Sequence, residues 1–263
     1  MKSPNSFSGR TSALGYEMPA KLEEAQRNAE RWSAHELLSW ASDVFGKRME
    51  LASAFGAEGI VLIDIASRVM PNLKVFIIDT GCLFPETLQL LEQVESRYGI
   101  RVDKVVPDIS LDLQAALHKP ALWGKDPDLC CEIRKVRPLR RKLSSLKAWV
   151  TAIRRDQTAQ RRNVSKLHWD ENFRLVKINP LADWTHEMVW SYIRQHRLAY
   201  NPLHDQNYPT LGCVQCTRPI RPGEDQRVGR WSGFAKQECG LHFRSSTPRT
   251  RPGEAETSSP PEE

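Results

Sequence analysis

The chain has 263 residues and a formal net charge of +6. Its hydrophobic content of 40% and charged content of 27% are ordinary for a soluble globular protein. The most apolar stretch, residues 59–70, contains Asp64 and Arg68 and is too short to span a bilayer, and the first ten residues lack the apolar run of a secretory signal. We therefore expect a cytoplasmic protein with no membrane partner.

Helix-type and strand-type patterns alternate along the chain. The helix-type segments are residues 21–46, 60–70, 85–98 and 185–196. The strand-type segments are residues 49–55, 74–79, 101–106, 147–153 and 173–178. This alternation predicts an α/β fold with a mainly parallel sheet. We expect a single domain over residues 17–244, with a disordered N-terminus (1–16) and a disordered tail (245–263).

Small-residue turns follow two of the strand-type segments, at residues 53–59 (SAFGAEG) and 79–87 (DTGCLFPET). In open parallel sheets ligands bind at the carboxyl ends of strands, and the amides of such a turn can hold an anion at a helix N-terminus. The first turn matches neither a Walker loop nor a GxGxxG fingerprint. Two turns in consecutive units still predict a nucleotide-sized site. Cys82, in the second turn, is interpreted as a loop thiol.

The positive net charge favours an anionic partner, either nucleic acid or a small ligand that carries phosphate or sulfate. The arginines concentrate near the motif-like stretches, and no long basic tract is interleaved with aromatic residues. We therefore expect no nucleic-acid partner.

Four of the six cysteines form two pairs, the adjacent Cys130 and Cys131 and the Cys-x-x-Cys of Cys213 and Cys216. Four thiolates in two pairs can hold zinc or an iron–sulfur cluster. Structural zinc sites usually separate the members of a pair by about two to four residues, whereas adjacent cysteines point apart and suit the separate corners of a cluster. A zinc ribbon, a vicinal disulfide and a redox Cys-x-x-Cys remain alternatives, although a reducing cytosol disfavours disulfides.

Cys239 lies in a late and polar stretch, KQECGLH at residues 236–242. A packing cysteine belongs in an apolar element, but this one has charged neighbours, a glycine and a histidine. It is therefore either a chance feature of the tail or a reactive thiol that has to move.

Three motifs together resemble one enzyme family. They are CCEIRKVRPL at residues 130–139, NPLH at 201–204 leading into GCVQCTRPI at 212–220, and ECGLH at 238–242. Over about residues 49–242 the chain resembles the assimilatory adenylyl-sulfate (APS) reductases, cluster-bearing relatives of the 3′-phosphoadenylyl-sulfate (PAPS) reductases. The resemblance implies a Rossmann-like fold of the adenine nucleotide alpha hydrolase type with a mobile C-terminal segment. It also implies reduction of APS to sulfite and AMP for cysteine biosynthesis, with thioredoxin as reductant.

The resemblance also implies roles for individual residues. The four paired cysteines would hold a [4Fe–4S] cluster, and Cys239 would be the nucleophile. The implied substrate-binding residues are Ser53, Phe55, Gly56, Glu58, Asp79, Thr80, Gly81, Lys135, Arg154, Arg155, Arg227 and Arg230. Two departures from the family pattern are Ala152, where glycine is common, and residues 158–160 (TAQ), where Ser-x-Thr is usual, and they leave the finer contacts of that loop open.

The residues around Cys239 agree with a moving nucleophile. Its thiolate would attack the sulfur of APS and expel AMP, and a second thiol would then attack the cysteine sulfur to release sulfite. The cysteine must therefore meet a nucleotide and an external reductant in turn. A segment beside a glycine can do this, and a packed cysteine cannot.

Three alternatives remain at the level of the sequence. The first is a PAPS reductase or a dual APS/PAPS enzyme. APS is preferred chiefly because the resemblance links the four cluster cysteines to APS use, and also because the identifiable arginines are assigned to the phosphosulfate end. The basic loop 161–166 could nevertheless accept a 3′-phosphate. The second is an ATP-using thiolation enzyme, whose Ser-Gly-Gly-x-Asp-Ser loop is interrupted here by Phe55 and Glu58. The third is a zinc-ribbon module that binds nucleic acid. A homo-oligomer is left open.

Overall fold

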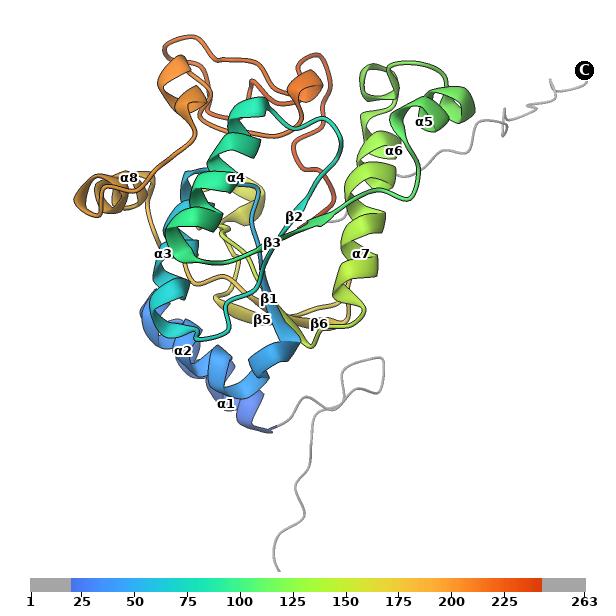
Figure 1. Cartoon of the computed structure of the whole chain (residues 1–263). Helices are drawn as coiled ribbons and strands as arrows, with labels where there is room; N and C mark the ends of the chain where they lie inside the picture. Colours follow the sequence, from blue (N-terminus) through green and yellow to red (C-terminus); the bar gives the residue numbers. More distant parts are fainter. Residues whose placement is uncertain (1–19, 243–263) are drawn as a thin grey trace, which may run out of the picture.

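The computed structural model describes residues 20–242 (Figure 1). The two ends that the sequence predicts to be disordered, residues 1–16 and 245–263, lie outside the described residues. Within the described part, no helix combines the length and the apolar character needed to cross a membrane.

Six strands form one sheet in the order β3-β2-β1-β4-β6-β5. They are β1 (Met49–Ala52), β2 (Val75–Ile78), β3 (Val102–Val105), β4 (Ala148–Val150), β5 (Leu167–Asp170) and β6 (Leu175–Ile178). All neighbouring strands are parallel except β5, which pairs antiparallel with β6. The predicted α/β fold with a mainly parallel sheet is confirmed, and the antiparallel edge strand β5 is an addition that the sequence did not reveal.

Eight α-helices accompany the sheet in the described residues. They are α1 (Ala20–Ala29), α2 (Ala34–Phe45), α3 (Ala57–Val69), α4 (Pro85–Tyr98), α5 (Leu111–His118), α6 (Pro127–Cys131), α7 (Arg137–Leu143) and α8 (His186–Gln195). A π-helical turn, Glu132–Val136, joins α6 to α7, so one continuous helical run carries both adjacent cysteines. Local π-helical turns inside α-helices are rare and often occur at functional sites.

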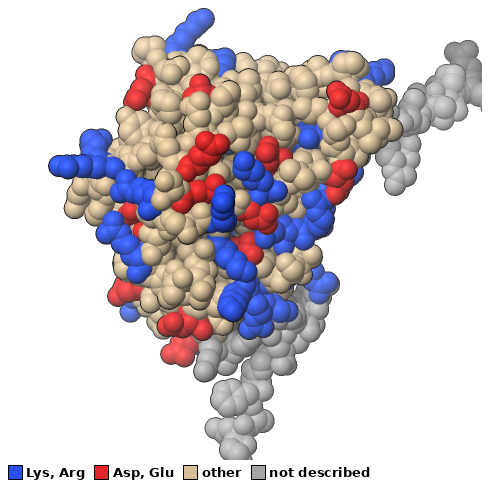
Figure 2. Space-filling view, in the orientation of Figure 1, with Lys and Arg blue, Asp and Glu red and all other residues tan. Residues whose placement is uncertain are grey.

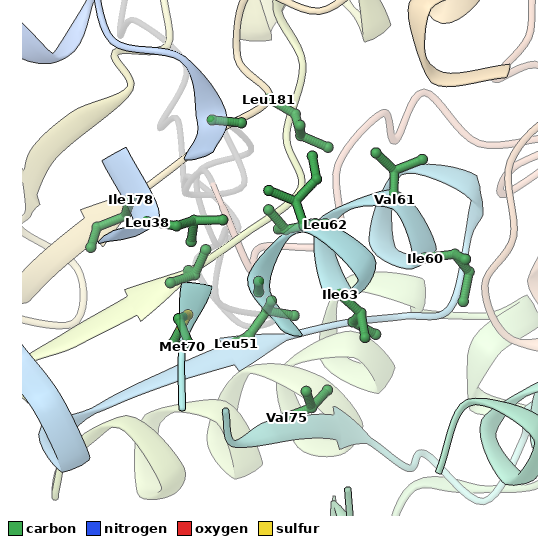
Figure 3. Close-up of a cluster of buried hydrophobic side chains, with 14 of the residues drawn as sticks. Leu38, Leu51, Ile60, Val61, Leu62, Ile63, Met70, Val75, Ile178 and Leu181 are labelled. Atoms are coloured by element: carbon green, nitrogen blue, oxygen red, sulfur yellow. The ribbon is translucent and has the colours of Figure 1, made fainter. Parts of the chain in front are cut away.

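Alternate residues of each strand face opposite sides of the sheet, and this divides the core in two. Val75 and Ile77 of β2 pack in a large cluster with α2, α3, α4 and α8, part of which is drawn in Figure 3. Phe76, between them, belongs instead to a smaller cluster with Leu139 and Leu143 of α7 and Trp149 of β4. The helical run that carries the cysteines therefore covers the opposite face from α3.

The segment 21–46, which the sequence predicts as helical throughout, is divided into α1 and α2 by a capping box. The Ser33 hydroxyl accepts a hydrogen bond from the backbone N–H of Glu36, and the Glu36 carboxylate accepts one from the backbone N–H of Ser33. These two bonds satisfy donors that a helix N-terminus otherwise leaves free, so a new helix begins here.

Figure 2 shows one face of the molecule, on which acidic side chains are interspersed among the basic ones. Ion pairs at exposed positions join the two signs of charge, as in Arg141–Asp108 and Arg218–Glu224. Basic side chains gather in the lower part of this face (Figure 2), and acidic side chains are mixed with them above.

Asp64, the acidic residue that interrupts the apolar stretch of α3, is a buried structural hub with 2% of its surface exposed. Its carboxylate accepts hydrogen bonds from the hydroxyls of Tyr98 and Tyr192, both at 2.8 Å, and pairs with Arg68 at 2.8 Å. Burial and the Asp64 carboxylate together raise the pKa of Tyr192 to about 12. One carboxylate thereby ties α3 to α4 and α8.

We expect Asp64→Ala to lower the free energy of unfolding by about 3 kcal/mol, because the hydroxyls of two partly buried tyrosines and one guanidinium lose their shared, buried partner. Chemical denaturation followed by circular dichroism measures this change. The matched control is Asp43→Ala on the exposed side of α2, for which we expect a change below about 0.5 kcal/mol. Equal effects of the two substitutions would contradict the structural role of Asp64.

Candidate functional site

A cavity of about 250 Å³ opens at the carboxyl ends of β1, β2 and β4. Ser53, Thr80 and Thr151, which follow these three strands, line one side of it. The other side is lined by residues of the long irregular segment after α8, from His204 to His242, which is drawn in orange to red in Figure 1. The cavity therefore lies where parallel sheets bind their ligands.

The first predicted turn forms the entrance to α3. The Phe55 side chain is fully buried, its φ is +57°, and its backbone N–H donates to the Ser53 hydroxyl at 3.1 Å. Gly56 begins α3 without a side-chain cap, which leaves the first helical amides free to bind an anion. Ser53, Gly56 and Glu58 line the cavity, whereas Phe55 holds the turn from the core side.

The two arginines of the Arg-Arg-Asp-Gln stretch point to different partners. Arg154, with 1% of its surface exposed, donates to the Glu58 carboxylate at 3.0 and 3.1 Å and lines the cavity. Arg155 pairs with Glu30 at 2.5 Å and does not line the cavity. Of this pair, only Arg154 is brought to the site, and its charge is already matched by an acid.

The second predicted turn connects the cavity to the cysteines. Thr80 lines the cavity, and its carbonyl accepts a hydrogen bond from Nε of the buried Arg134 at 2.5 Å. The Thr80 hydroxyl accepts from the backbone N–H of Cys82 at 3.2 Å, which leaves its own proton free for the Cys213 sulfur at 3.3 Å. Asp79 and Gly81 belong to this turn but do not line the cavity. The Asp79 carboxylate accepts a hydrogen bond from the Gly81 N–H at 2.9 Å, which stabilises the turn.

The two cysteine pairs, which are about eighty residues apart in sequence, lie close enough to influence one another's ionisation. Burial and, after it, the neighbouring thiols of Cys131, Cys213 and Cys216 together raise the pKa of Cys130 to about 12. The Gln114 amide donates to the Cys130 sulfur at 3.8 Å. An antiparallel bridge between Leu83 and Cys213 joins the second turn to the cysteine loop.

These four thiols fit an iron–sulfur cluster by the chemistry of the donor set. All four are reduced, and thiolates are the ligands such clusters use. Residues 20–242 contain no group of three or more His, Cys, Asp or Glu side chains arranged to hold a single metal ion. Cysteines around a cluster each bind a different iron, so their sulfurs lie further apart than those around one zinc ion. The fit therefore rests on four converging thiols and the buried cations beside them.

Lys135 is the cation that connects the thiols to the cavity. It lies one helical turn after Cys131, lines the cavity and has 8% of its surface exposed. Burial alone would lower the pKa of its ammonium group, but the Cys213, Cys131 and Cys239 thiols raise the pKa above its usual value. Arg230 lies on the same side, with its guanidinium 4.4 Å from the Trp231 ring.

The predicted nucleophile lies inside the cavity. Cys239 is partly exposed and lines the cavity together with Glu238, Leu241 and His242. The His242 ring stacks on Trp149 with a centroid separation of 5.7 Å. Burial, with Lys177 and Arg161 nearby, holds the pKa of His242 well below its usual value, so its ring is neutral. The segment that the sequence predicts to be mobile is therefore docked here.

Several lining residues were not among the predicted substrate-binding residues. Arg161, at the start of the basic loop 161–166, is buried and lines the cavity, and Trp149, His204 and His242 line it as well. His242 could have been found from its place in the ECGLH motif beside Cys239. Trp149 looks like an ordinary strand residue, and no pattern in the sequence distinguishes it.

The mostly parallel sheet, with the cavity at its strand ends, has the α/β fold of the adenine nucleotide alpha hydrolase type. The family profile of the phosphoadenosine phosphosulfate reductase domain matches residues 48–219. The chain belongs to this family.

Named relatives agree with this assignment. The chain is 44% identical over 208 residues to adenosine 5'-phosphosulfate reductase 2 of Bacillus subtilis (strain 168), a match covering 79% of this chain and 88% of that protein. It is 42% identical over 222 residues to adenosine 5'-phosphosulfate reductase of Halalkalibacterium halodurans, covering 84% and 96%.

Solved structures show the same architecture. The phosphoadenylyl-sulfate (PAPS) reductase from Candida auris, in a phosphate complex, superposes with a TM-score of 0.67 at 26% identity, covering 76% of this chain and 98% of that one. Candida glabrata FMN adenylyltransferase shares the fold alone, with a TM-score of 0.52 at 14% identity over 79% of this chain and 67% of that one.

A substitution at Gly59 tests the role of the first turn in nucleotide binding. A Cβ at Gly59 would lie 2.4 Å from the Ser53 hydroxyl, so we expect Gly59→Ala to displace that hydroxyl and weaken AMP binding about tenfold. Isothermal titration calorimetry measures the affinity. Gly124→Ala is the control, because a Cβ there meets no atom within 4 Å. If Gly59→Ala bound AMP like the control, the turn would not form part of the nucleotide site.

Proposed function

We propose that this protein reduces adenylyl sulfate to sulfite and AMP in assimilatory sulfate reduction, in the cytoplasm, with thioredoxin as reductant and a [4Fe–4S] cluster. One observation carries the proposal: the Cys239 thiol, the Lys135 ammonium and the anion-binding turn after β1 line the same cavity. The names of the relatives support the same substrate.

In the first step the Cys239 thiolate attacks the sulfur of the sulfate group. A sulfur–sulfur bond forms, the bond between that sulfur and the bridging oxygen breaks, and AMP leaves with the bridging oxygen and its electron pair. The product on the enzyme is a cysteine S-sulfonate. No electron has yet been transferred from an external donor.

In the second step a thiolate of reduced thioredoxin attacks the Cys239 sulfur. The sulfur–sulfur bond of the S-sulfonate breaks, and sulfite leaves with the electron pair. The second thiol of thioredoxin then resolves the mixed disulfide and restores Cys239. Thioredoxin thereby loses two electrons and two protons, and the sulfate sulfur gains the two electrons.

The cations of the cavity would bind and orient the phosphosulfate group. Lys135, Arg227 and Arg230 all line the cavity and are buried or partly buried, where a positive charge acts more strongly on an anion than it does in water. When bound to the four paired cysteines, the cluster would supply negative charge and structural support beside Lys135. Lys135 would then couple that charge to the sulfate.

A PAPS reductase is the alternative within the family, because the Candida auris relative carries that name. The ion pairs of the basic residues favour APS. Arg155 is paired with Glu30, and Lys166 with Asp183 at 2.8 Å, so these cations already have acidic partners and are not free for a 3′-phosphate. A nucleotide whose 3′-phosphate is bound without cations would bind roughly a hundredfold more weakly than one that lacks this phosphate. Comparing kcat/KM for APS and PAPS at equal ionic strength tests this, and a preference for PAPS would overturn the assignment.

We expect Cys239→Ser to abolish sulfite formation while leaving AMP binding and iron content unchanged. Incubation of the unaltered protein with APS and no thiol should add about 80 Da, one SO₃ group, to the peptide that contains Cys239. Peptide mass spectrometry measures the adduct. An adduct on Cys82 instead would show that Cys239 is not the nucleophile.

For the cluster ligands, we expect serine at any one of the four paired cysteines to cause loss of iron, whereas Cys82→Ser retains it. Lys135→Ala should keep iron but lower kcat/KM about a hundredfold, because a buried positive charge beside the reacting anion is removed. Iron analysis and sulfite release are the measurements. The control is the exposed Lys125→Ala. Unchanged turnover in Lys135→Ala would exclude Lys135 from the mechanism.

A further inference from the structure

The tail segment, residues 236–242, is attached to the domain by side chains rather than by regular backbone pairing. Lys236 pairs with Asp128, and the Arg227 guanidinium donates to the Gln237 carbonyl at 2.7 Å. Gly240 has a φ of +83°, and a Cβ there would lie 3.2 Å from Val136. Leu241 packs against the smaller core cluster. Such contacts can hold a segment in place and can also be released as a unit.

The strongest of these contacts is made by the residue directly before the nucleophile. Nε and Nη2 of Arg161 donate to the two oxygens of Glu238, each at 2.8 Å, in a bidentate pair. Only 6% of the Glu238 surface and 8% of the Arg161 surface are exposed. A second arginine, Arg227, lies 3.7 Å from the same carboxylate. Bidentate arginine–carboxylate pairs fix orientation as well as distance.

Arg161 is itself held by the nucleotide turn. Its Nη1 donates to the Gln157 side-chain carbonyl, and the Gln157 amide donates to the Glu58 carboxylate at 3.0 Å. Because Arg161 has only donors, the orientation of the Gln157 amide is fixed by these two bonds. The position of Glu238 is therefore set by residues that line the cavity.

We propose that Glu238 is a positioning residue, whose pairing with Arg161 sets the balance between a docked and an undocked tail segment. The expected effect on the two half-reactions rests on the proposed function, whereas the expected effect on docking of the tail segment does not. In the docked state Cys239 lies in the cavity, as sulfonation requires. In the undocked state Cys239 is free to meet an external thiol, as sulfite release requires.

The pair suits this role because its net stability is limited. Two charges removed from water lose hydration, and their mutual attraction offsets much of that loss. Removal of one partner, however, leaves the other buried and uncompensated. Docking is thus specific without being permanent, and loss of the Glu238 charge should shift the balance toward the undocked state.

The proposal predicts opposite effects of Glu238→Gln on the two half-reactions. AMP release from APS without reductant should slow about tenfold, because the docked state is less populated. Sulfite release from the preformed S-sulfonate by a dithiol should become faster. For Glu238→Asp, which keeps the charge, both rates should lie between those of Glu238→Gln and those of the unaltered protein. Gln237→Ala, at the exposed neighbouring position, should leave both rates unchanged.

A measurement without substrate separates this proposal from the proposed function. The rate at which iodoacetamide alkylates Cys239, extrapolated to the fully ionised thiol and read by peptide mass, should rise about tenfold in Glu238→Gln. The extrapolation removes any effect of the lost charge on the ionisation of the thiol. An unchanged alkylation rate, or half-reactions that both slow alike, would overturn the role of Glu238. Absence of any turnover of APS would instead reject the proposed function and leave the alkylation test valid.

Discussion

The arrangement of the whole site depends on a buried positive charge, the Lys135 ammonium. Among residues 20–242 no carboxylate forms an ion pair with it, and the groups that raise its pKa against the effect of burial are the sulfurs of Cys213, Cys131 and Cys239, from the cysteine loop, the helical run and the tail segment. An ammonium removed from water without a compensating charge is too costly to retain. The buried charge of Lys135 is therefore favoured by a thiolate beside it, and Cys213, whose pKa Lys135 lowers against the effect of burial, is the sulfur best placed to supply one. The paired cysteines and Cys239 therefore lie at the same end of the sheet as Lys135.

The cavity wall and the cysteine site are parts of one structure. Thr80 contributes to both, since its carbonyl binds Arg134 and its hydroxyl reaches Cys213. The bridge between Leu83 and Cys213 fixes the cysteine loop to the same turn. Loss of a group bound to the paired cysteines would therefore disturb the cavity wall as well. Through this coupling, a group bound to the thiols would support the nucleotide site without transferring an electron in the proposed steps.

The alternation of strands and helices and the two turns at strand ends could be predicted from the sequence, because local patterns encode them. Strand β5 could not, because its single antiparallel pairing depends on an edge position that only the finished sheet defines. The helical run at 127–143 could not be predicted, because the π-helical turn at 132–136 interrupts its α-helical periodicity. Arg154 and Arg155 are neighbours in the chain but form ion pairs with different acids. Arg154 pairs with Glu58 and Arg155 with Glu30, and both acids are distant in sequence. Long-range ion pairs of this kind leave no local signature.

In the proposed reaction Cys239, and not the reductant, attacks the sulfate sulfur. The amount of AMP released in a single turnover without any thiol tests this most directly, since AMP leaves when the sulfur–sulfur bond forms. We expect one AMP for each Cys239 and no sulfite until a dithiol is added. If AMP and sulfite appeared together, and only in the presence of the reductant, the external thiol would be the nucleophile and the docked position of Cys239 would need another explanation.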